Sequence, residues 1–338
     1  MKELTIGNNE KNQRVDKFLA KYLDKAPKSF IYKMIRKKNI TLNGKKFQGN
    51  EILNQGDVIK IFFSDETLEK FTKGKVIDTS KKTNSLKLNI KDIVYEDKNI
   101  ILYNKPVGVL SQQDNNNQIS ANEMLIEYML ESGEITRESL ETFKPAVCNR
   151  LDRNTSGILI FGKTLDALQQ MAKALKTRTI DKYYICLVKG VITDYDKVDN
   201  YLIKDKASNK VRIIKDIKNK DLTQAEHIVT AYNPLGNNGK VTLLKVELFT
   251  GKTHQIRSHL AFKGHPVVGD YKYGDSEFNK YFKDKYKINS QLLHSYQLNF
   301  RDFTKDMEYL NGQKFKAMPD NKFLGALKGE NLNEYLEQ

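Results

Sequence analysis

The chain has 338 residues, a length that favours two domains over one. Lysine and arginine number 57 against 42 aspartate and glutamate residues, which gives a net charge of +15. This excess favours a polyanionic partner, with nucleic acid ahead of an anionic membrane surface. The alternative is a lysine-rich surface that only keeps the protein soluble.

Neither a membrane span nor a secretion signal is indicated. No apolar run approaches the roughly 20 residues of a spanning helix, and the polar N-terminus lacks a signal-peptide core. Cys148 and Cys186 are not at metal-ligand spacing and are expected to be reduced thiols. We therefore expect a cytoplasmic protein with no membrane partner.

Residues 1–62 are expected to form a small separate module. Apolar residues recur at helical spacing over 14–23, and a second amphipathic helix follows. A strand over 40–42 then leads into Asn43-Gly44, a strong hairpin signal, and a closing strand is expected over 58–62. The order helix, helix, strand, hairpin, strand resembles the αL-type RNA-binding module of a small-subunit ribosomal protein and of some tyrosyl-tRNA synthetases.

Six cations gather at the end of the second helix and in the hairpin of this module. Cations at a helix C-terminus complement the helix dipole, which is the structural interpretation. Their clustering also predicts a face that contacts RNA phosphates. The six residues are Lys33, Arg36, Lys37, Lys38, Lys45 and Lys46.

The rest of the chain is expected to be a polar linker over 63–87, a larger domain over 88–330 and a tail over 331–338. The larger domain opens with predicted strands over 93–97 and 100–104. They lead into Lys105-Pro106-Val107-Gly108, where proline and glycine favour a rigid turn.

The most informative stretch is the string N-R-L-D-R-N-T-S-G over 149–157. It sets Asp152 between Arg150 and Arg153, whose charges are expected to favour the ionised carboxylate. Turn-forming residues follow, and then a short apolar run over 158–161 that is typical of a buried strand. The structural alternative is an aspartate that only accepts turn hydrogen bonds.

Further elements are predicted as a helix over 166–177 and strands over 182–190, 224–229, 240–248 and 292–298. Alternation along 182–190 places Tyr184, Cys186 and Val188 on one face. A tyrosine that only fills the core is the alternative to a functional Tyr184.

A last predicted helix carries an arginine that can meet a carboxylate. Thr253 is its predicted N-cap, the helix is expected to run to Lys263, and Arg257 lies on its second turn. His254 and His259 are five residues apart, off a single helical face, and no third ligand is evident. A metal site is therefore not expected.

Several strings in this domain together resemble the RluA-like family of RNA pseudouridine synthases. They are K-P-x-G at 105–108, R-L-D-x-x-T-S-G at 150–157, K-x-Y-x-x-x-V-x-G at 182–190, G-[RK]-T-H-Q-I-R-x-H-L at 251–260, G-H-P-[IV]-x-G-D at 264–270 and L-L-H-[AS] at 292–295. Two departures occur: Asn149 stands where many members have histidine, and Ser111-Gln112-Gln113 replaces a histidine usual after K-P-x-G.

The resemblance implies an α+β catalytic domain with a mixed, mostly antiparallel sheet. It implies that Asp152 is the catalytic residue, acting at ribose C1′ or C2′ as nucleophile, charge stabiliser or base. Tyr184 is expected to stack on the uracil or assist removal of its C5 proton, and Arg257 to pair with Asp152. Arg150, Arg153 and the six module cations are expected to contact RNA, and no metal or organic cofactor is required.

The expected activity is isomerisation of uridine to pseudouridine in structured RNA. The N-terminal module and the charge favour large-subunit ribosomal RNA over transfer RNA, and we expect a monomer. Two other classes stay open. One is a non-catalytic RNA-binding protein, which the joint presence of Asp152, Tyr184 and Arg257 argues against. The other is a glycoside hydrolase, which should show a second carboxylate in a matching motif.

Overall fold

The structure, a computed structural model, describes residues 1–72, 88–114, 118–205, 210–214 and 225–336. Contacts divide the chain into two compact units. The first comprises Met1–Lys87, Met124–Ala146 and Lys163–Leu168; the second comprises Leu88–Glu123, Val147–Gly162 and Gln169–Gln338. The predicted boundaries at 62, 87 and 330 stay a prediction, and most of the predicted linker lies outside the described residues.

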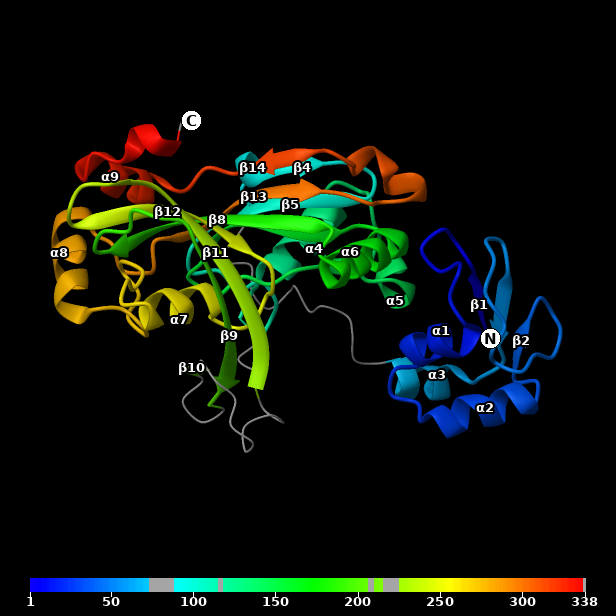
Figure 1. The fold of residues 1–338 in the computed structure, drawn as a ribbon. Coiled ribbons are helices and arrows are strands. Elements are labelled where there is room, and N and C mark those ends of the chain that lie inside the picture. The colour runs from blue at the N-terminus through cyan, green and yellow to red at the C-terminus, as the bar shows by residue number, and fades with distance from the viewer. Residues whose placement is uncertain (73–87, 115–117, 206–209, 215–224, 337–338) are drawn as a thin grey trace. The chain divides into compact units, whose positions relative to one another are not determined.

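The first unit holds a three-stranded antiparallel sheet in the order β1-β3-β2 (Figure 1). Its elements are β1 (Lys2–Thr5), α1 (Val15–Tyr22), α2 (Lys28–Arg36), β2 (Ile40–Leu42), β3 (Val58–Ile61), α3 (Asp65–Thr72) and α5 (Ser139–Thr142). The sequence predicted neither β1 nor α3. Helix α3 forms because Leu68 and Phe71, three residues apart, both pack against the apolar cluster of this unit.

The second unit is organised by an 11-stranded mixed sheet among the described residues, with the main path β10-β9-β11-β12-β8-β13-β7-β5-β4. Its strands are β4 (Ile93–Glu96), β5 (Ile100–Lys105), β6 (Ala146–Val147), β7 (Ser156–Gly162), β8 (Ile180–Lys189), β9 (Asp196–Lys204), β10 (Val211–Ile214), β11 (Ala225–Asn237), β12 (Val241–Leu248), β13 (Leu293–Phe300) and β14 (Lys314–Lys316). On the main path only β13 and β7 pair in parallel, so the predicted mixed, mostly antiparallel sheet is confirmed.

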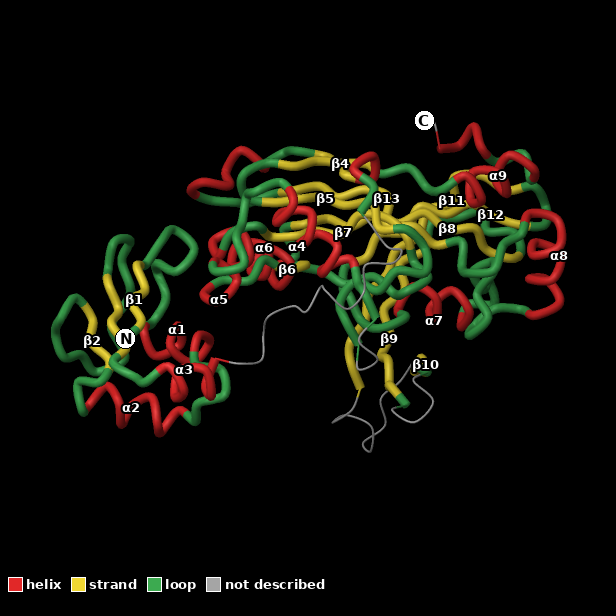
Figure 2. The backbone as a smooth tube through the Cα atoms, turned by 180° about the vertical axis from the view of Figure 1, so that it is seen from behind, coloured by secondary structure: helices red, strands yellow, loops and turns green. Residues whose placement is uncertain are grey.

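The remaining helices are α4 (Ala121–Glu131), α6 (Leu165–Thr177), α7 (Gln255–Phe262), α8 (Ser276–Tyr286) and α9 (Asn321–Gly329), with short 3₁₀ turns at Ile90–Asp92, Lys305–Leu310 and Asn333–Leu336. Helices α8 and α9 share an apolar cluster with β8 and β12, whereas α7 contacts β10 and β11 (Figure 2). Among the described residues, no helix is both long and apolar enough to cross a membrane.

Strand β13 joins the two strands that carry the sequence motifs. Ser295 of β13 lies opposite Tyr184 of β8 on one side and opposite Gly157 of β7 on the other. Gly157 has φ +110, and a Cβ at this position would overlap the backbone of Ser295. Only glycine allows this close approach, which brings the turn before β7 next to the strand of Tyr184.

The start of α7 differs from the prediction. The helix begins at Gln255, and its N-cap is His254 in the left-handed conformation with φ 54, not Thr253. The left-handed conformation of His254 delays the start of the helix by one residue, and no side-chain hydrogen bond is made at this cap. The loop before the helix is held by Gln255, whose Oε1 accepts from the Lys252 backbone N–H and from the Thr250 hydroxyl.

Candidate active site

Asp152 lies in a tight turn between a fixed loop and a buried strand. The Thr155 N–H donates to the Asp152 carbonyl at 3.0 Å and closes the turn, and the fully buried β7 begins at Ser156. Before the turn, the Asn149 side chain accepts from the Ile160 N–H at 2.7 Å. The Asp152 carboxylate is therefore aimed by backbone geometry that is fixed on both sides, as the sequence predicted for this turn.

Residues 105–111 hold the same turn from the other side. The Ser111 hydroxyl accepts from the Leu151 N–H at 3.0 Å and donates to the Leu151 carbonyl at 2.9 Å. The Gly108 N–H donates to the Arg153 carbonyl at 2.9 Å. Ser111 is buried, and it stands in the segment where the resembled family usually has a histidine. In this chain its hydroxyl makes a direct contact to the residue before Asp152.

Lys105 is a buried cation beneath the turn. Its Nζ donates to the carbonyls of Pro106, Val109 and Arg153 at 3.0, 2.8 and 3.2 Å. Burial lowers the pKa of Lys105 to about 7, and the negative charge of Asp152 opposes that shift. Sequence reasoning treated Lys105 only as part of a turn motif. The signal for a buried lysine in the sequence was its position at the end of a strongly apolar strand.

Arg257 is shared by two carboxylates. Its Nη1 donates to Asp152 Oδ2 at 2.8 Å, while Nε and Nη2 donate to the two oxygens of Asp270 at 2.7 and 2.8 Å. The side chain of Asp152 is 28% exposed, against 8% for Arg257 and none for Asp270. The predicted arginine therefore does lie against the predicted aspartate, and a second, fully buried acid fixes its guanidinium in place.

Asp270 was missed as a site residue, although it lies in one of the matched strings. It also accepts from the backbone N–H groups of Lys272 and Tyr273 at 2.8 and 3.2 Å. Burial alone would raise the pKa of Asp270, but hydrogen bonds and charge from Arg257 lower it below its usual value. For Arg257, burial acts to lower the pKa, and Asp270 followed by Asp152 raises it overall. Asp270 and Arg257 are thus both charged at neutral pH.

Buried polar contacts fix helix α7 on the sheet and thereby aim Arg257. Gln255 is buried, and its Nε2 donates to the Val229 carbonyl at 3.0 Å and the Thr230 hydroxyl at 2.9 Å, both on β11. The matched string T-H-Q-I-R therefore has a physical basis, because its glutamine anchors the first turn of the helix, which also presents the arginine.

Tyr184 is buried on β8 beside the same turn. Burial raises the pKa of Tyr184 to about 12, a hydrogen bond with Ser295 acts in the opposite direction, and the charge of Asp152 adds to the increase. The phenol is consequently neutral at pH 7. Tyr184 therefore lies close enough to Asp152 for the charge of the carboxylate to raise the pKa of the phenol.

His254 and Tyr273 line the site next to Arg257. His254 Nδ1 lies 2.9 Å from the Tyr273 hydroxyl, and the Arg257 guanidinium carbon lies 5.3 Å from the centre of the Tyr273 ring. Burial lowers the pKa of His254, while Asp152 acts to raise it. Neither residue was predicted to belong to the site. Among the described residues, no group of three acidic, histidine or cysteine side chains could hold a metal ion.

The two arginines that flank Asp152 in sequence do not provide its ionic partner. Arg150 and Arg153 are exposed, and Arg153 Nε donates to the Gly108 carbonyl at 3.0 Å. The guanidinium that bonds the Asp152 carboxylate comes from Arg257, more than one hundred positions later in the chain.

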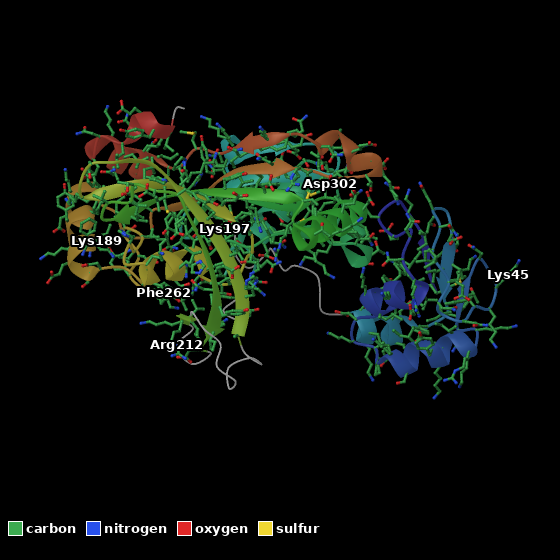
Figure 3. All side chains as sticks on the ribbon, viewed as in Figure 1. Lys45, Lys189, Lys197, Arg212, Phe262 and Asp302 are labelled. Carbon is green, nitrogen blue, oxygen red and sulfur yellow. The ribbon has the colours of Figure 1, made fainter. Side chains whose placement is uncertain are left out.

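The six cations of the N-terminal module are all exposed side chains of the first unit, and Lys45 is labelled in Figure 3. Lys38 adopts a left-handed conformation with φ 59 after α2, and Lys45 bonds back across the hairpin to Leu42. The backbone is therefore fixed at Lys38 and Lys45, while all six charged side chains are exposed.

A scan against family models matches residues 99–262 to the family described as RNA pseudouridylate synthase. A "Ribosomal large subunit pseudouridine synthase C" from Haemophilus influenzae is 30% identical over 97% of this chain and 94% of its own length. A protein of the same name from Buchnera aphidicola subsp. Schizaphis graminum is 34% identical over 86% of each chain. The solved structure "Human RNA Pseudouridylate Synthase Domain Containing 4" shares the fold, with TM-score 0.57 and 21% identity over 71% of this chain and 93% of that one.

Proposed function

Because the chain belongs to the RNA pseudouridylate synthase family and is an RNA pseudouridine synthase, we propose that its substrate is large-subunit ribosomal RNA. The names of the relatives that match over most of both chains support this target. The net charge of +15 supports a large polyanion as the partner. Transfer RNA is the second candidate, on charge alone.

The observation that carries the catalytic assignment is the bond from Arg257 to Asp152, fixed from behind by Asp270. The reaction breaks the bond between ribose C1′ and uracil N1 and re-forms it to C5, and the breaking step develops positive charge on the sugar. A carboxylate that is paired with a cation, aimed and partly open to solvent suits that charge.

Only one oxygen of Asp152 is engaged by Arg257. Oδ2 accepts from Nη1, and within the described part of the chain Oδ1 makes no hydrogen bond. We assign Oδ1 to the ribose of a uridine that has been flipped out of its helix. Attack at C1′, stabilisation of the sugar cation and removal of the C2′ proton all use this oxygen.

Tyr184 is assigned to the uracil ring. Its aromatic face offers a wall against which the detached base can turn. With a pKa of about 12 the hydroxyl is neutral at pH 7, so it assists the C5 proton step by handing a proton on and not as a standing phenolate.

RNA contacts outside the cluster of Asp152, Arg257 and Tyr184 are assigned to the exposed cations. Arg150 and Arg153 lie in the turn of Asp152, where they can hold phosphates next to the flipped nucleotide. Lys33, Arg36, Lys37, Lys38, Lys45 and Lys46 are assigned to phosphates of the surrounding RNA. The enzyme is proposed to act as a monomer in the cytoplasm, where its two free cysteines stay reduced.

The target is tested by mapping pseudouridines in ribosomal and transfer RNA from cells with and without this gene. Loss of one or more sites confined to large-subunit ribosomal RNA is the expected result. Loss confined to transfer RNA would replace the proposed target with the second candidate.

A further inference from the structure

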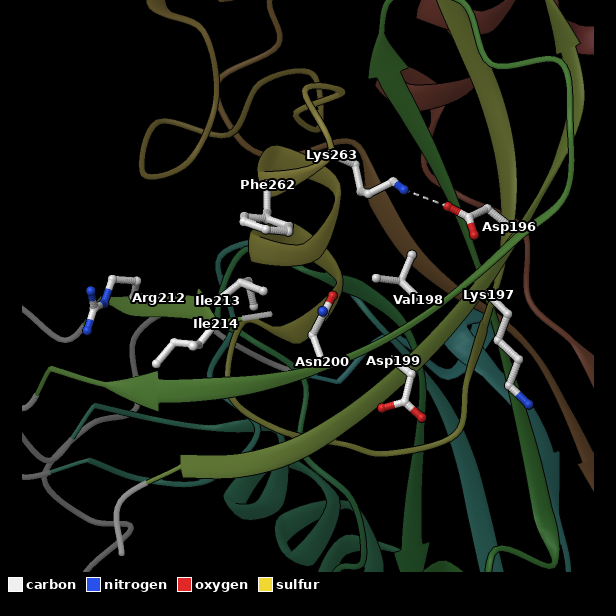
Figure 4. A pocket seen from close by; sticks show the side chains of 10 residues that line it. All are labelled: Asp196, Lys197, Val198, Asp199, Asn200, Arg212, Ile213, Ile214, Phe262 and Lys263. Atoms are coloured by element: carbon white, nitrogen blue, oxygen red, sulfur yellow. Dashed lines mark ion pairs between the residues drawn. The ribbon is translucent and has the colours of Figure 1, made fainter. Parts of the chain in front are cut away.

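A pocket lies outside the cluster of Asp152, Arg257 and Tyr184. It has a volume of about 850 Å³ and is formed by β9, β10 and the C-terminal end of α7 (Figure 4). Residues that line it include Asp196, Val198, Asn200, Ile213, Phe262 and Lys263, and none of its lining residues belongs to that cluster.

One buried polar atom of the pocket lining lacks a partner. Asn200, which points toward α7 in Figure 4, is 9% exposed. Among the described residues, Asn200 Oδ1 has no hydrogen-bond partner. Buried polar atoms are rarely left unpaired without a ligand or water to meet them.

The exposed groups of the pocket define the chemistry of its ligand. Phe262 is 41% exposed at the end of α7 and presents an apolar ring. Arg212 lies at the open edge, where Figure 4 shows its guanidinium directed away from the sheet. A stacking face, a buried amide and a cation at the rim are the groups with which proteins bind single nucleotides of RNA.

The two carboxylates at the pocket are already engaged. Asp196 accepts from Lys263 at 2.8 Å and from the Tyr232 hydroxyl at 2.9 Å. Asp199 lies 2.6 Å from His227 Nε2. The charge of Asp196 is therefore partly offset by Lys263, and Arg212 at the rim can attract a phosphate.

We propose that this pocket binds a second, unstacked nucleotide of the RNA substrate, with its base against Phe262, its edge at Asn200 and its phosphate at Arg212. A small rotation of the Asn200 amide gives Oδ1 a base N–H as its partner. The site would hold the RNA strand next to the target uridine, since α7 carries Arg257 at one end and Phe262 at the other. The inference rests on the proposed function in one respect, because it assumes that the ligand is part of the RNA substrate.

The first test measures a pseudouridine-forming reaction on a ribosomal RNA fragment. Base–aromatic stacking predicts that Phe262→Ala raises KM about fivefold or more and leaves the single-turnover rate at saturating RNA unchanged. Ile90→Ala truncates another exposed apolar side chain outside the pocket and should change neither value. An unchanged KM in Phe262→Ala overturns the proposal, and so does a collapse of the saturating rate, because the pocket would then only support Arg257.

The second test needs no turnover. Methyl groups of Ile213 and Val198 line the pocket and serve as NMR probes in the full chain. Titration with 5′-UMP, CMP, AMP or GMP should shift both signals saturably for at least one nucleotide, whereas ribose 5-phosphate should not, and Phe262→Ala should abolish the shift. Absence of any shift, or an equal shift in Phe262→Ala, overturns the proposal. Failure of the ribosomal RNA target would leave this readout intact.

Discussion

Arg257 sets the charge balance of the site because it stands between one open and one buried carboxylate. Asp270 has no exposed side-chain surface and depends on Arg257 for two of its hydrogen bonds. Asp152 bonds Arg257 through one oxygen only, and Asp270 occupies the rest of the guanidinium. On the proposed mechanism, the same arginine therefore serves both stability and catalysis.

Replacing Arg257 with methionine should reduce both the stability of the fold and the rate of the reaction. The change leaves the Asp270 carboxylate buried without its cation, and removal of one member of a buried ion pair costs about 3 to 5 kcal/mol. Urea denaturation measures the stability, and single-turnover kinetics measures the rate. Lys263→Met, which breaks an exposed ion pair at the C-cap of the same helix, is the matched control and should cost less than about 1 kcal/mol. Equal stability of the two variants would contradict the shared role of Arg257.

Lys105 should give stability a measurable pH dependence. Its pKa is about 7 in the folded protein and near 10.4 in an unfolded chain, so between these values the unfolded state binds more protons. The free energy of unfolding should therefore rise with pH from about 7 to 10, by up to about 1.4 kcal/mol per pH unit from this group. It should level off below pH 7.

Lys105→Met should remove this contribution. The measurement is the difference in unfolding free energy between wild type and variant at a series of pH values from 6 to 9.5. Lys322→Met, at an exposed position, should leave the pH dependence as in wild type. Parallel curves for wild type and Lys105→Met would show that Lys105 is charged throughout.

Strand β13 is the element on which the site geometry depends most. It lies between β7 and β8, so Ser295 is opposite Gly157 at the start of β7 and also opposite Tyr184 of β8. The close approach is made at Gly157, where no side chain fits.

Gly157→Ala should therefore lower both stability and activity, because the new Cβ collides with the Ser295 backbone and the residue keeps a positive φ. We expect a loss of more than about 1 kcal/mol in urea denaturation and a lower single-turnover rate. Gly239 also has a positive φ, +81, but open space around its Cβ position. Gly239→Ala thus isolates the backbone strain, and an equal loss of rate in both variants would contradict the role of the close approach.

Several helices and strands of this domain follow closely from local patterns, whereas β9, α8 and the pairing of the strands do not. Strand β7 and helix α6 lie where apolar runs and helical spacing predict them. The position of β13 between β7 and β8 has no local signal, because it pairs residues more than one hundred positions apart. His254 as the helix cap also escaped prediction, since its left-handed conformation has no signal in the local sequence.

At the site, residue types indicated Asp152, Tyr184 and Arg257, and the resemblance gave them roles. Asp270 and Lys105 could not be identified in the same way. Their importance comes from complete burial next to an opposite charge or next to carbonyl groups, which only the folded chain shows.

On the scale of the whole molecule, the six module cations should determine much of the salt dependence of RNA binding. A deletion is a poor test, since Glu10 accepts from Thr142 and Asn9 accepts from the Leu165 N–H within the first unit. Substitution of all six by glutamine in the full chain is cleaner. Each lost phosphate contact should reduce the slope of log affinity against log salt by about 0.7 to 0.9.

The matched control neutralises six exposed lysines of the second unit, namely Lys280, Lys283, Lys305, Lys314, Lys322 and Lys328. This variant has the same net charge and should keep more of the wild-type slope. Equal slopes for the two variants would mean that the module contributes only general charge. A fall in the single-turnover rate at saturating RNA in the module variant alone would mean that the module takes part in the chemistry.

Complementation with an Asp152→Asn variant tests the account as a whole. Cells that lack this gene receive either the wild-type gene or the variant, at equal protein levels, and pseudouridines are mapped in large-subunit ribosomal RNA. Asparagine preserves the shape of the side chain and removes its charge. We predict that wild type restores the missing sites and that Asp152→Asn restores none, while the purified variant still folds and binds the RNA. Restoration of those sites by Asp152→Asn would contradict the catalytic assignment.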